Sequence, residues 1–168
     1  MILLGIDPGF GITGYGIIEA RDRQNPRLVE AGIIKSKKEK TFSERLGEIH
    51  EQIEELLGEF KPSCVAVEDI YSAGAFPRSA ILIGHVRGIV LLCAAQNGIP
   101  VFSYYPLQVK KALLGNGNAT KAQVQRMVQT SLGLDQPIHP DDCSDALAIA
   151  LCHANHLRYS SGVLAGIK

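Results

Sequence analysis

Four acidic residues stand where their carboxylates could act together. Asp7 ends the apolar run ILLGID and is followed by a Pro-Gly sequence, a pattern that predicts a strand ending in a carboxylate at a turn. Glu68 ends a second apolar run, CVAVE. Asp142 and Asp145 are three residues apart at the start of a third apolar run, and this spacing places both on one face of a helix.

The chemistry open to such a cluster is metal-dependent. Carboxylates within a few Å of one another repel, which raises the pKa of at least one of them, and a bound divalent cation removes that penalty. Oxygen ligands without a zinc-spaced set of Cys or His favour Mg²⁺, with Mn²⁺ as a substitute. Two ions roughly 3.5 to 4 Å apart activate a water and stabilise the leaving oxygen in phosphodiester hydrolysis. The four acids therefore predict a two-metal nuclease site.

Each acid also has a structural explanation. Asp7 could simply form a turn before Pro-Gly, and acids at the start of a helix often only stabilise its positive end. A further acid, Asp69, follows Glu68 directly. Because side chains alternate along a strand, Glu68 shares a face with Ala66 whereas Asp69 points the other way. We therefore expect Glu68, and not Asp69, to belong to the cluster.

The glycines after Asp7 imitate a nucleotide-binding motif. Gly9, Gly11 and Gly14 satisfy G-x-G-x-x-G, but the dinucleotide motif needs a helix after its first turn. Here β-branched and aromatic residues follow, which predicts a returning strand. The same hairpin opens the ATPases of the sugar-kinase, actin and Hsp70 type, which close a second lobe over ATP. A chain of 168 residues is too short for that second lobe.

The elements needed to bring the acids together can be read in order. Residues 2–7, 13–18 and 27–37 are predicted as three antiparallel neighbours, so the third strand runs parallel to the first. An amphipathic helix over residues 42–60, with a capping box at Thr41 and Glu44, must cross over and deliver residues 63–70 as a parallel strand. Asp7 and Glu68 would then end at the same edge of the sheet, where ligand sites of open α/β sheets gather.

The second half of the chain carries the remaining candidate residues. Residues 71–77 predict a small loop in which Tyr71 or Phe76 could stack on a base. Residues 78–97 predict a helix that is apolar nearly all round, with Gly84 and Gly88 open to close approach, and we expect it to serve both the core and a dimer contact. A short strand (100–104) and a helix with Lys110 follow. Lys121 lies in the first turn of the next helix, after a Gly-Asn loop. The loop, the free N–H groups at the helix start and the lysine together favour binding of a phosphate.

The last helix is expected to run from residue 139 to about residue 157, which gives one domain over 1–157 and a flexible tail over 158–168. Residues 35–40 are rich in lysine and are either a solvated loop or a contact with backbone phosphates. The formal net charge is zero, with 17 basic and 17 acidic side chains. This balance argues against a general nucleic-acid binder. If several of the acids are gathered in a metal site, however, the rest of the surface would be net positive.

Cysteine and hydropathy patterns limit the cellular setting. The four cysteines show no C-x-x-C spacing and lie within apolar runs, which predicts buried, reduced thiols. The most apolar stretch, residues 79–95, carries His85 and Arg87 in its middle, which argues against a membrane helix. With no N-terminal signal pattern, a cytoplasmic protein is expected.

Several of these motifs together are similar to one family. GIDPG (5–9), VAVEDIY (65–71), RG (87–88), QVKKALLGNGNATKAQVQRMV (from 108) and DDCSDALAIA (from 141) resemble the bacterial RuvC Holliday-junction resolvases, in the same order and over residues 1 to about 157. The resemblance implies a ribonuclease-H-like α/β fold with a five-stranded mixed sheet, order 3-2-1-4-5, and helices on both faces. It also implies a Mg²⁺-dependent homodimer that nicks four-way junction DNA symmetrically to leave 5′-phosphates and 3′-hydroxyls, and that works with the RuvA and RuvB branch-migration proteins.

The resemblance also assigns roles. It implies that the metal ligands and catalytic acids are Asp7, Glu68, Asp142 and Asp145, and that the DNA contacts are Tyr71, Arg78, Lys110 and Lys121. Some members have His in place of the first acid of the last helix; this chain has Asp142, with His139 just upstream. The loop over 72–77 lacks a basic residue, so its phosphate contact would depend on Arg78. Two alternatives stay open: a ribosomal-RNA-maturation nuclease of the same superfamily, and a junction-binding module without catalysis.

Overall fold

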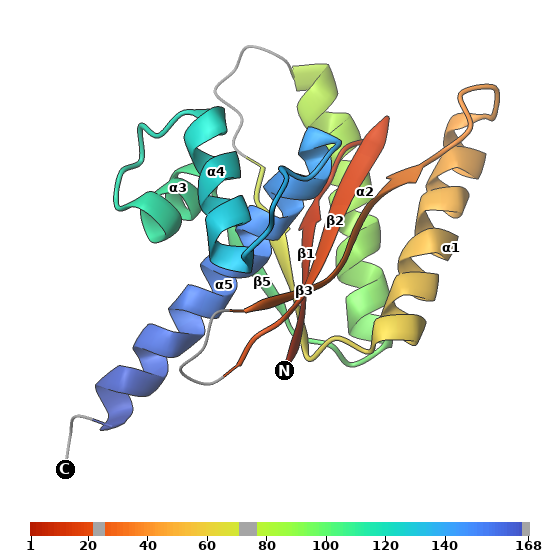
Figure 1. Ribbon diagram of the computed structural model, residues 1–168. Helices are drawn as coiled ribbons and strands as arrows, with labels where there is room; N and C mark the ends of the chain where they lie inside the picture. Colours follow the sequence, from red (N-terminus) through yellow and green to blue (C-terminus); the bar gives the residue numbers. More distant parts are fainter. Residues whose placement is uncertain (22–25, 71–76, 166–168) are drawn as a thin grey trace.

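A five-stranded mixed sheet forms the centre of the molecule, with helices on both of its faces (Figure 1). The computed structural model describes residues 1–21, 26–70 and 77–165. In chain order the elements are β1 (Ile2–Asp7), β2 (Ile12–Glu19), β3 (Arg27–Lys35), α1 (Phe42–Phe60), β4 (Cys64–Glu68), α2 (Pro77–Gln96), β5 (Val101–Tyr104), α3 (Pro106–Leu114), α4 (Lys121–Leu132) and α5 (Asp141–Ala165).

The strand order is β3-β2-β1-β4-β5, which confirms the predicted order 3-2-1-4-5. β1, β2 and β3 are antiparallel neighbours, whereas β4 and β5 run parallel to β1. The long crossover through α1 is what makes β4 parallel, because a tight turn can only reverse a chain. Ile6 pairs with Val67, so Asp7 and Glu68, the last residues of β1 and β4, lie side by side at one edge of the sheet. The topology is that of the ribonuclease-H-like fold.

The two faces of the sheet have separate cores. One face packs against α3, α4 and α5 through residues such as Leu3, Ala66 and Leu147. The other packs against α1 and α2 through residues such as Ile6 and Ile53. Strands that are covered on both faces need apolar side chains at every position. This burial explains why β1 and β4 are continuous apolar runs with an acid only at the last residue.

α5 packs unusually close to the sheet because glycines line its path. A Cβ atom at Gly5 of β1 would collide with the carbonyl oxygen of Ala146, and one at Gly14 of β2 would collide with that of Asp142. Only residues without a side chain permit this contact between backbones. Since Gly14 pairs with Asp7, the contact at Gly14 places the start of α5 beside the end of β1.

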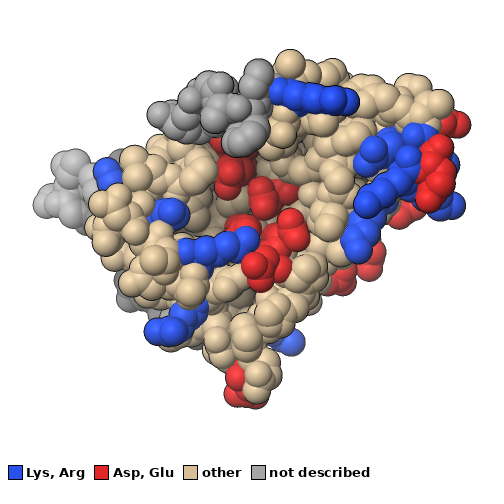
Figure 2. Space-filling view, turned by 90° about the horizontal axis from the view of Figure 1, so that it is seen from above, with Lys and Arg blue, Asp and Glu red and all other residues tan. Residues whose placement is uncertain are grey.

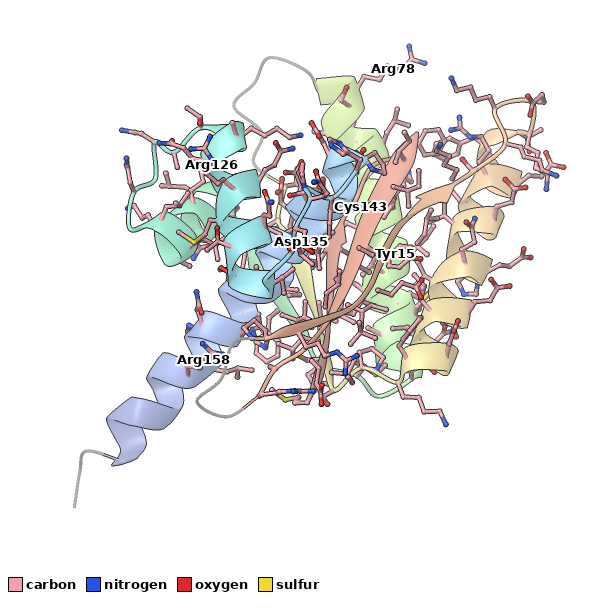
Figure 3. The ribbon with its side chains drawn as sticks, in the orientation of Figure 1. Tyr15, Arg78, Arg126, Asp135, Cys143 and Arg158 are labelled. Carbon is pink, nitrogen blue, oxygen red and sulfur yellow. The ribbon has the colours of Figure 1, made fainter. Side chains whose placement is uncertain are left out.

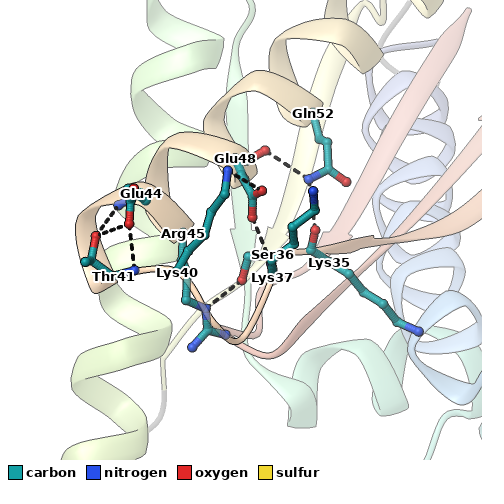
Figure 4. A network of polar contacts seen from close by, with 9 residues as sticks. All are labelled: Lys35, Ser36, Lys37, Lys40, Thr41, Glu44, Arg45, Glu48 and Gln52. Atoms are coloured by element: carbon teal, nitrogen blue, oxygen red, sulfur yellow. Dashed lines mark hydrogen bonds and ion pairs between the residues drawn. The ribbon is translucent and has the colours of Figure 1, made fainter.

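The connection from β3 to α1 is held by a polar network (Figure 4). The predicted capping box is present, with Thr41 and Glu44 each bonding to the backbone of the other. Glu48 binds the ammonium group of Lys40 at 2.7 Å and accepts a hydrogen bond from the backbone N–H of Lys37 at 2.8 Å. In the described chain, therefore, part of the lysine-rich stretch over 35–40 stabilises the helix start.

Several predicted boundaries were wrong. The strand predicted over 63–70 is β4, Cys64–Glu68, and α5 begins at Asp141 rather than at residue 139. β3 ends at Lys35 rather than at residue 37. α5 runs to Ala165, well past the expected end near residue 157. The flexibility proposed for residues 158–168 stays a prediction.

Candidate active site

The four predicted acids come from three elements that meet at one edge of the sheet. Asp7 and Glu68 are the last residues of β1 and β4, and Asp142 and Asp145 lie in the first turns of α5. The charges of Asp145 and Asp142 act on Asp7, and those of Asp7 and Asp145 act on Glu68. Seen from this edge, acidic side chains gather in a hollow of the surface (Figure 2).

Burial and mutual repulsion keep two of these carboxyls partly protonated near neutral pH. Burial, followed by the charges of Asp145 and Asp142, raises the pKa of Asp7 to about 6, although Lys121 opposes the shift. Burial, followed by the charges of Asp7 and Asp145, raises the pKa of Glu68 to about 7. The four carboxyls thus repel one another when all are ionised, and a bound cation would offset that repulsion.

Asp69 points away from the cluster, as the alternation along the strand predicted. Its Oδ1 accepts a hydrogen bond from the N–H of Ile70 at 2.9 Å and lies 3.2 Å from a guanidinium nitrogen of Arg87. Arg87 also donates to the hydroxyl of Ser103 at 2.7 Å. This ion pair ties the end of β4 to α2 and β5, and it leaves Glu68 as the acid of this strand that joins the cluster.

Two of the predicted DNA-contacting lysines lie in the same pocket as the acids. A cavity of about 240 Å³ is lined by Glu68, Asp145, Lys110 and Lys121, together with apolar residues of α3, α4 and α5. The ammonium nitrogen of Lys121 lies 2.8 Å from Oδ2 of Asp145 and 3.5 Å from Oδ2 of Asp141, and its hydrogen bond to Asp145 raises the pKa of Lys121. Lys121 is therefore a counter-ion of the acidic cluster in this structure.

Of the other two predicted DNA contacts, only Arg78 is among the described residues, and it does not line this pocket. Arg78 is in the first turn of α2, and Figure 3 shows its side chain extending outward from that end of the helix. Tyr71 lies outside the described residues. Cys143, which follows Asp142, is buried in α5 on the sheet side.

Two residues that position the site were not identified from the sequence. Thr13 is fully buried, and its hydroxyl donates to the carbonyl of Gly9 at 2.8 Å and accepts from the N–H of Gly9 at 3.2 Å. These bonds close the turn that follows Asp7. A threonine four residues after a glycine in a tight turn is the signal that could have indicated this role. Arg87, the second such residue, was noted in the apolar stretch and in the family motif, but not as a residue that positions the site.

The donor set of the cluster fits a hard divalent cation. Four carboxylates supply only oxygen ligands, which is the preference of Mg²⁺ and Mn²⁺ rather than of zinc. The raised pKa values of Asp7 and Glu68 and the ammonium group held against Asp145 both indicate a place where positive charge is needed.

Comparison with known sequences agrees with this arrangement. The profile of a family described as crossover junction endodeoxyribonuclease RuvC matches residues 3–153. A relative of that description from Pelotomaculum thermopropionicum is 45% identical over 156 residues, which cover 93% of this chain and 94% of the relative. Another from Rhodopirellula baltica is 45% identical over 152 residues, covering 89% and 84%.

Solved structures show the same likeness. The RuvC structure of Thermus thermophilus matches with a TM-score of 0.88 at 38% identity and covers 95% of this chain and 97% of that chain. The Thermus thermophilus RuvC in complex with a Holliday junction substrate gives the same TM-score and identity, with coverage of 96% and 97%. The yeast mitochondrial Holliday junction resolvase, at 12% identity and a TM-score of 0.67, over 96% of this chain and 85% of that chain, shares the fold. The chain belongs to the RuvC family of crossover junction endodeoxyribonucleases.

Proposed function

We propose that this protein is a Holliday-junction-resolving endonuclease that hydrolyses phosphodiester bonds in four-way DNA junctions. The observation that carries the proposal is the convergence of four carboxylates from β1, β4 and α5, two of which, Glu68 and Asp145, line a pocket together with two lysines. Family membership and the junction-bound structure of the Thermus thermophilus relative support the choice of substrate.

Asp7, Glu68, Asp142 and Asp145 would hold the metal, which we propose to be Mg²⁺, with Mn²⁺ as a substitute and two ions per site. When bound, the metal supplies an activated water and neutralises the charge that develops on the phosphate oxygens. The buried ends of β1 and β4 hold Asp7 and Glu68 in place, so their carboxylates need little reorganisation to act as ligands.

The lysines attract the DNA backbone to this edge of the sheet. Lys110 and Lys121 line the pocket, and we propose that both bind phosphates of the cleaved strand. Lys121 would exchange Asp145 for a phosphate oxygen, since both partners offer the same anionic acceptor. We propose that Arg78, exposed at the start of α2, and Tyr71, which lies outside the described residues, also contact DNA.

The exposed apolar face of α2 supports a homodimer. Residues Arg78–Gln96 have a mean hydropathy of 1.6, and 22% of this stretch is buried. By length and composition alone the stretch could also cross a membrane, but helices in protein cores commonly meet that criterion. Ile81 and Leu92 are 60% and 52% exposed, and a Cβ at Gly88 would meet no described atom within 4 Å. If a second copy covered this face, the two active sites would be related by a two-fold axis, which matches the symmetry of a four-way junction.

The proposed reaction is a pair of symmetric nicks that leave 5′-phosphate and 3′-hydroxyl ends. Junctions of this kind are mobile, so we also propose that the dimer acts with the branch-migration proteins RuvA and RuvB in the cytoplasm. This assignment follows the family resemblance.

A junction-cleavage assay tests the proposal. The full-length protein is incubated with a labelled four-way DNA junction, a linear DNA duplex of the same sequence, or a double-stranded RNA, each with Mg²⁺ or with a chelator. We expect paired nicks in the junction with Mg²⁺, and no cleavage by Asp7→Asn although that variant still binds the junction. Equal cleavage of linear duplex would contradict junction selectivity, and preferential cleavage of RNA would favour an RNA-maturation nuclease.

A further inference from the structure

A second group of potential metal ligands lies between α1 and α2, apart from the carboxylate cluster. One ligand atom each of His50, Glu54 and Cys93 lies within 4.8 Å of the others. His50 and Glu54 are four residues apart on α1, which places them on one face of the helix, and Cys93 comes from α2. The two helices lie side by side on one face of the sheet (Figure 1), opposite the face covered by α5.

The chemistry of this group differs from that of the active site. An imidazole, a carboxylate and a thiol are the ligand types of zinc, whereas Mg²⁺ takes oxygen ligands. Zinc bonds of about 2.0 to 2.3 Å separate tetrahedral ligand atoms by roughly 3.3 to 3.8 Å. The observed spacing of up to 4.8 Å must therefore close by about 1.5 Å at most. His50 and Glu54 are only partly buried, so rotation of their side chains can make that adjustment.

Contacts around the group hold two of its ligands in place. The amide nitrogen of Asn97 donates to both carboxylate oxygens of Glu54, at 3.1 and 3.3 Å, and to the carbonyl of Cys93 at 2.9 Å. A polar partner that orients a ligating side chain is a regular feature of metal sites. Cys93 itself is fully buried, so its thiol has a fixed direction towards α1.

We propose that His50, Glu54 and Cys93 form a zinc site that joins α1 to α2. The three side chains supply three ligands, and a water completes the tetrahedron from the partly open side. The Cys93 thiol is buried and carries a proton that the metal must displace. Binding replaces the S–H bond with an S–Zn bond and releases one proton to solvent.

Cobalt spectroscopy tests the site in the full-length protein, because Co²⁺ bound to a thiolate absorbs in the near ultraviolet and Co²⁺ bound only to carboxylates does not. We expect one equivalent of Co²⁺ to produce this band, one equivalent of Zn²⁺ to abolish it, and excess Mg²⁺ to leave it unchanged. Cys93→Ser should lose the band. Cys64→Ser and Cys143→Ser, which alter other buried thiols, should keep it.

A second measurement covers the case in which Cys93→Ser fails to fold, which circular dichroism would reveal. His50→Ala changes a partly exposed side chain and should weaken Zn²⁺ binding at least tenfold in titration calorimetry, with junction cleavage in Mg²⁺ unchanged. The absence of a thiolate band in the unmodified protein, its persistence in Cys93→Ser, or unchanged zinc affinity in His50→Ala would each overturn the proposal. None of these outcomes depends on the nuclease assignment.

Discussion

At the scale of single residues, Asp7 illustrates how the site opposes stability. Its carboxyl is held where burial and neighbouring acids disfavour its charge. We predict that Asp7→Asn makes the metal-free protein more stable at pH 7.5, by about 2 to 3 kcal/mol, because the rise in pKa from 3.8 to about 6 corresponds to roughly that free energy. Urea denaturation in the presence of a chelator measures the difference.

The pH dependence of this difference has a defined sign. Because the folded-state pKa of Asp7 is raised, the folded protein retains a proton that the unfolded chain releases, and the destabilisation is fully present above about pH 6. It is lost as the pH falls towards 3.8. The stability gain of Asp7→Asn should therefore shrink between pH 7.5 and pH 4. A gain that is constant over this range would contradict the assigned origin.

Lys121 is the other residue whose effect can be predicted from the cluster. Its ammonium group lies 2.8 Å from Oδ2 of Asp145, where it would compete with the metal ion that we propose. We predict that Lys121→Met strengthens Mn²⁺ binding at least about threefold, measured by calorimetry, while junction binding weakens and depends less on salt. Lys111→Met removes an exposed lysine of α3 that does not line the pocket and serves as the control. Unchanged Mn²⁺ affinity would show that Lys121 does not compete.

At the scale of elements, the docking of α5 onto the hairpin of β1 and β2 positions the acids. We predict that Gly14→Ala lowers the free energy of unfolding by about 1 to 3 kcal/mol and reduces junction cleavage, because the added methyl group pushes the start of α5 from the sheet. Gly11→Ala is the matched control, since a Cβ at Gly11 would meet no described atom within 4 Å. Urea denaturation and the cleavage assay check both variants.

β5 and α5 are joined by a buried hydrogen bond that gives a further prediction. The hydroxyl of Tyr104 lies 2.6 Å from Nδ1 of His153, a residue that is 1% exposed and whose pKa burial lowers to about 4. We predict that Tyr104→Phe costs about 1 to 3 kcal/mol of stability, because it leaves a buried nitrogen unpaired. Tyr15→Phe removes an exposed bond to Glu30 and should cost under about 0.5 kcal/mol. Similar losses in both would contradict this reasoning.

At the scale of the whole molecule, the residue pattern predicted the shared edge of the sheet, and the family resemblance supplied the full strand order. The apolar runs that end in Asp7 and Glu68, with an amphipathic crossover between them, define two parallel strands and the shared edge. The pairing of Lys121 with Asp145 could not be predicted in this way, because it depends on how α4 docks against α5. The burial of His153 in the middle of α5 could not be predicted for the same reason. Hydrophobic periodicity does not reveal which polar side chain finds a partner in another element.

The quaternary structure is testable through α2. We predict that Leu92→Glu converts the dimer to a monomer in light scattering coupled to gel filtration, because a charge would enter the centre of an apolar contact. Val29→Glu introduces the same charge at an exposed apolar position of β3, 43% exposed, and should leave the dimer intact. A monomeric parent protein, or a dimer that survives Leu92→Glu, would contradict the proposed role of α2.

The glycine contact between α5 and the sheet determines when the carboxylates of the proposed metal site take up their positions. Because backbone meets backbone at Gly5 and Gly14, main-chain geometry fixes the distance between α5, which carries Asp142 and Asp145, and β1, which carries Asp7. Among the described residues, no long side chain lies at these two contacts that could repack and change this distance. The entropy cost of ordering the four carboxylates is thus met during folding, so the metal ion that we propose would bind to a preorganised site. Affinity in such a receptor depends on charge and dehydration more than on conformational adjustment.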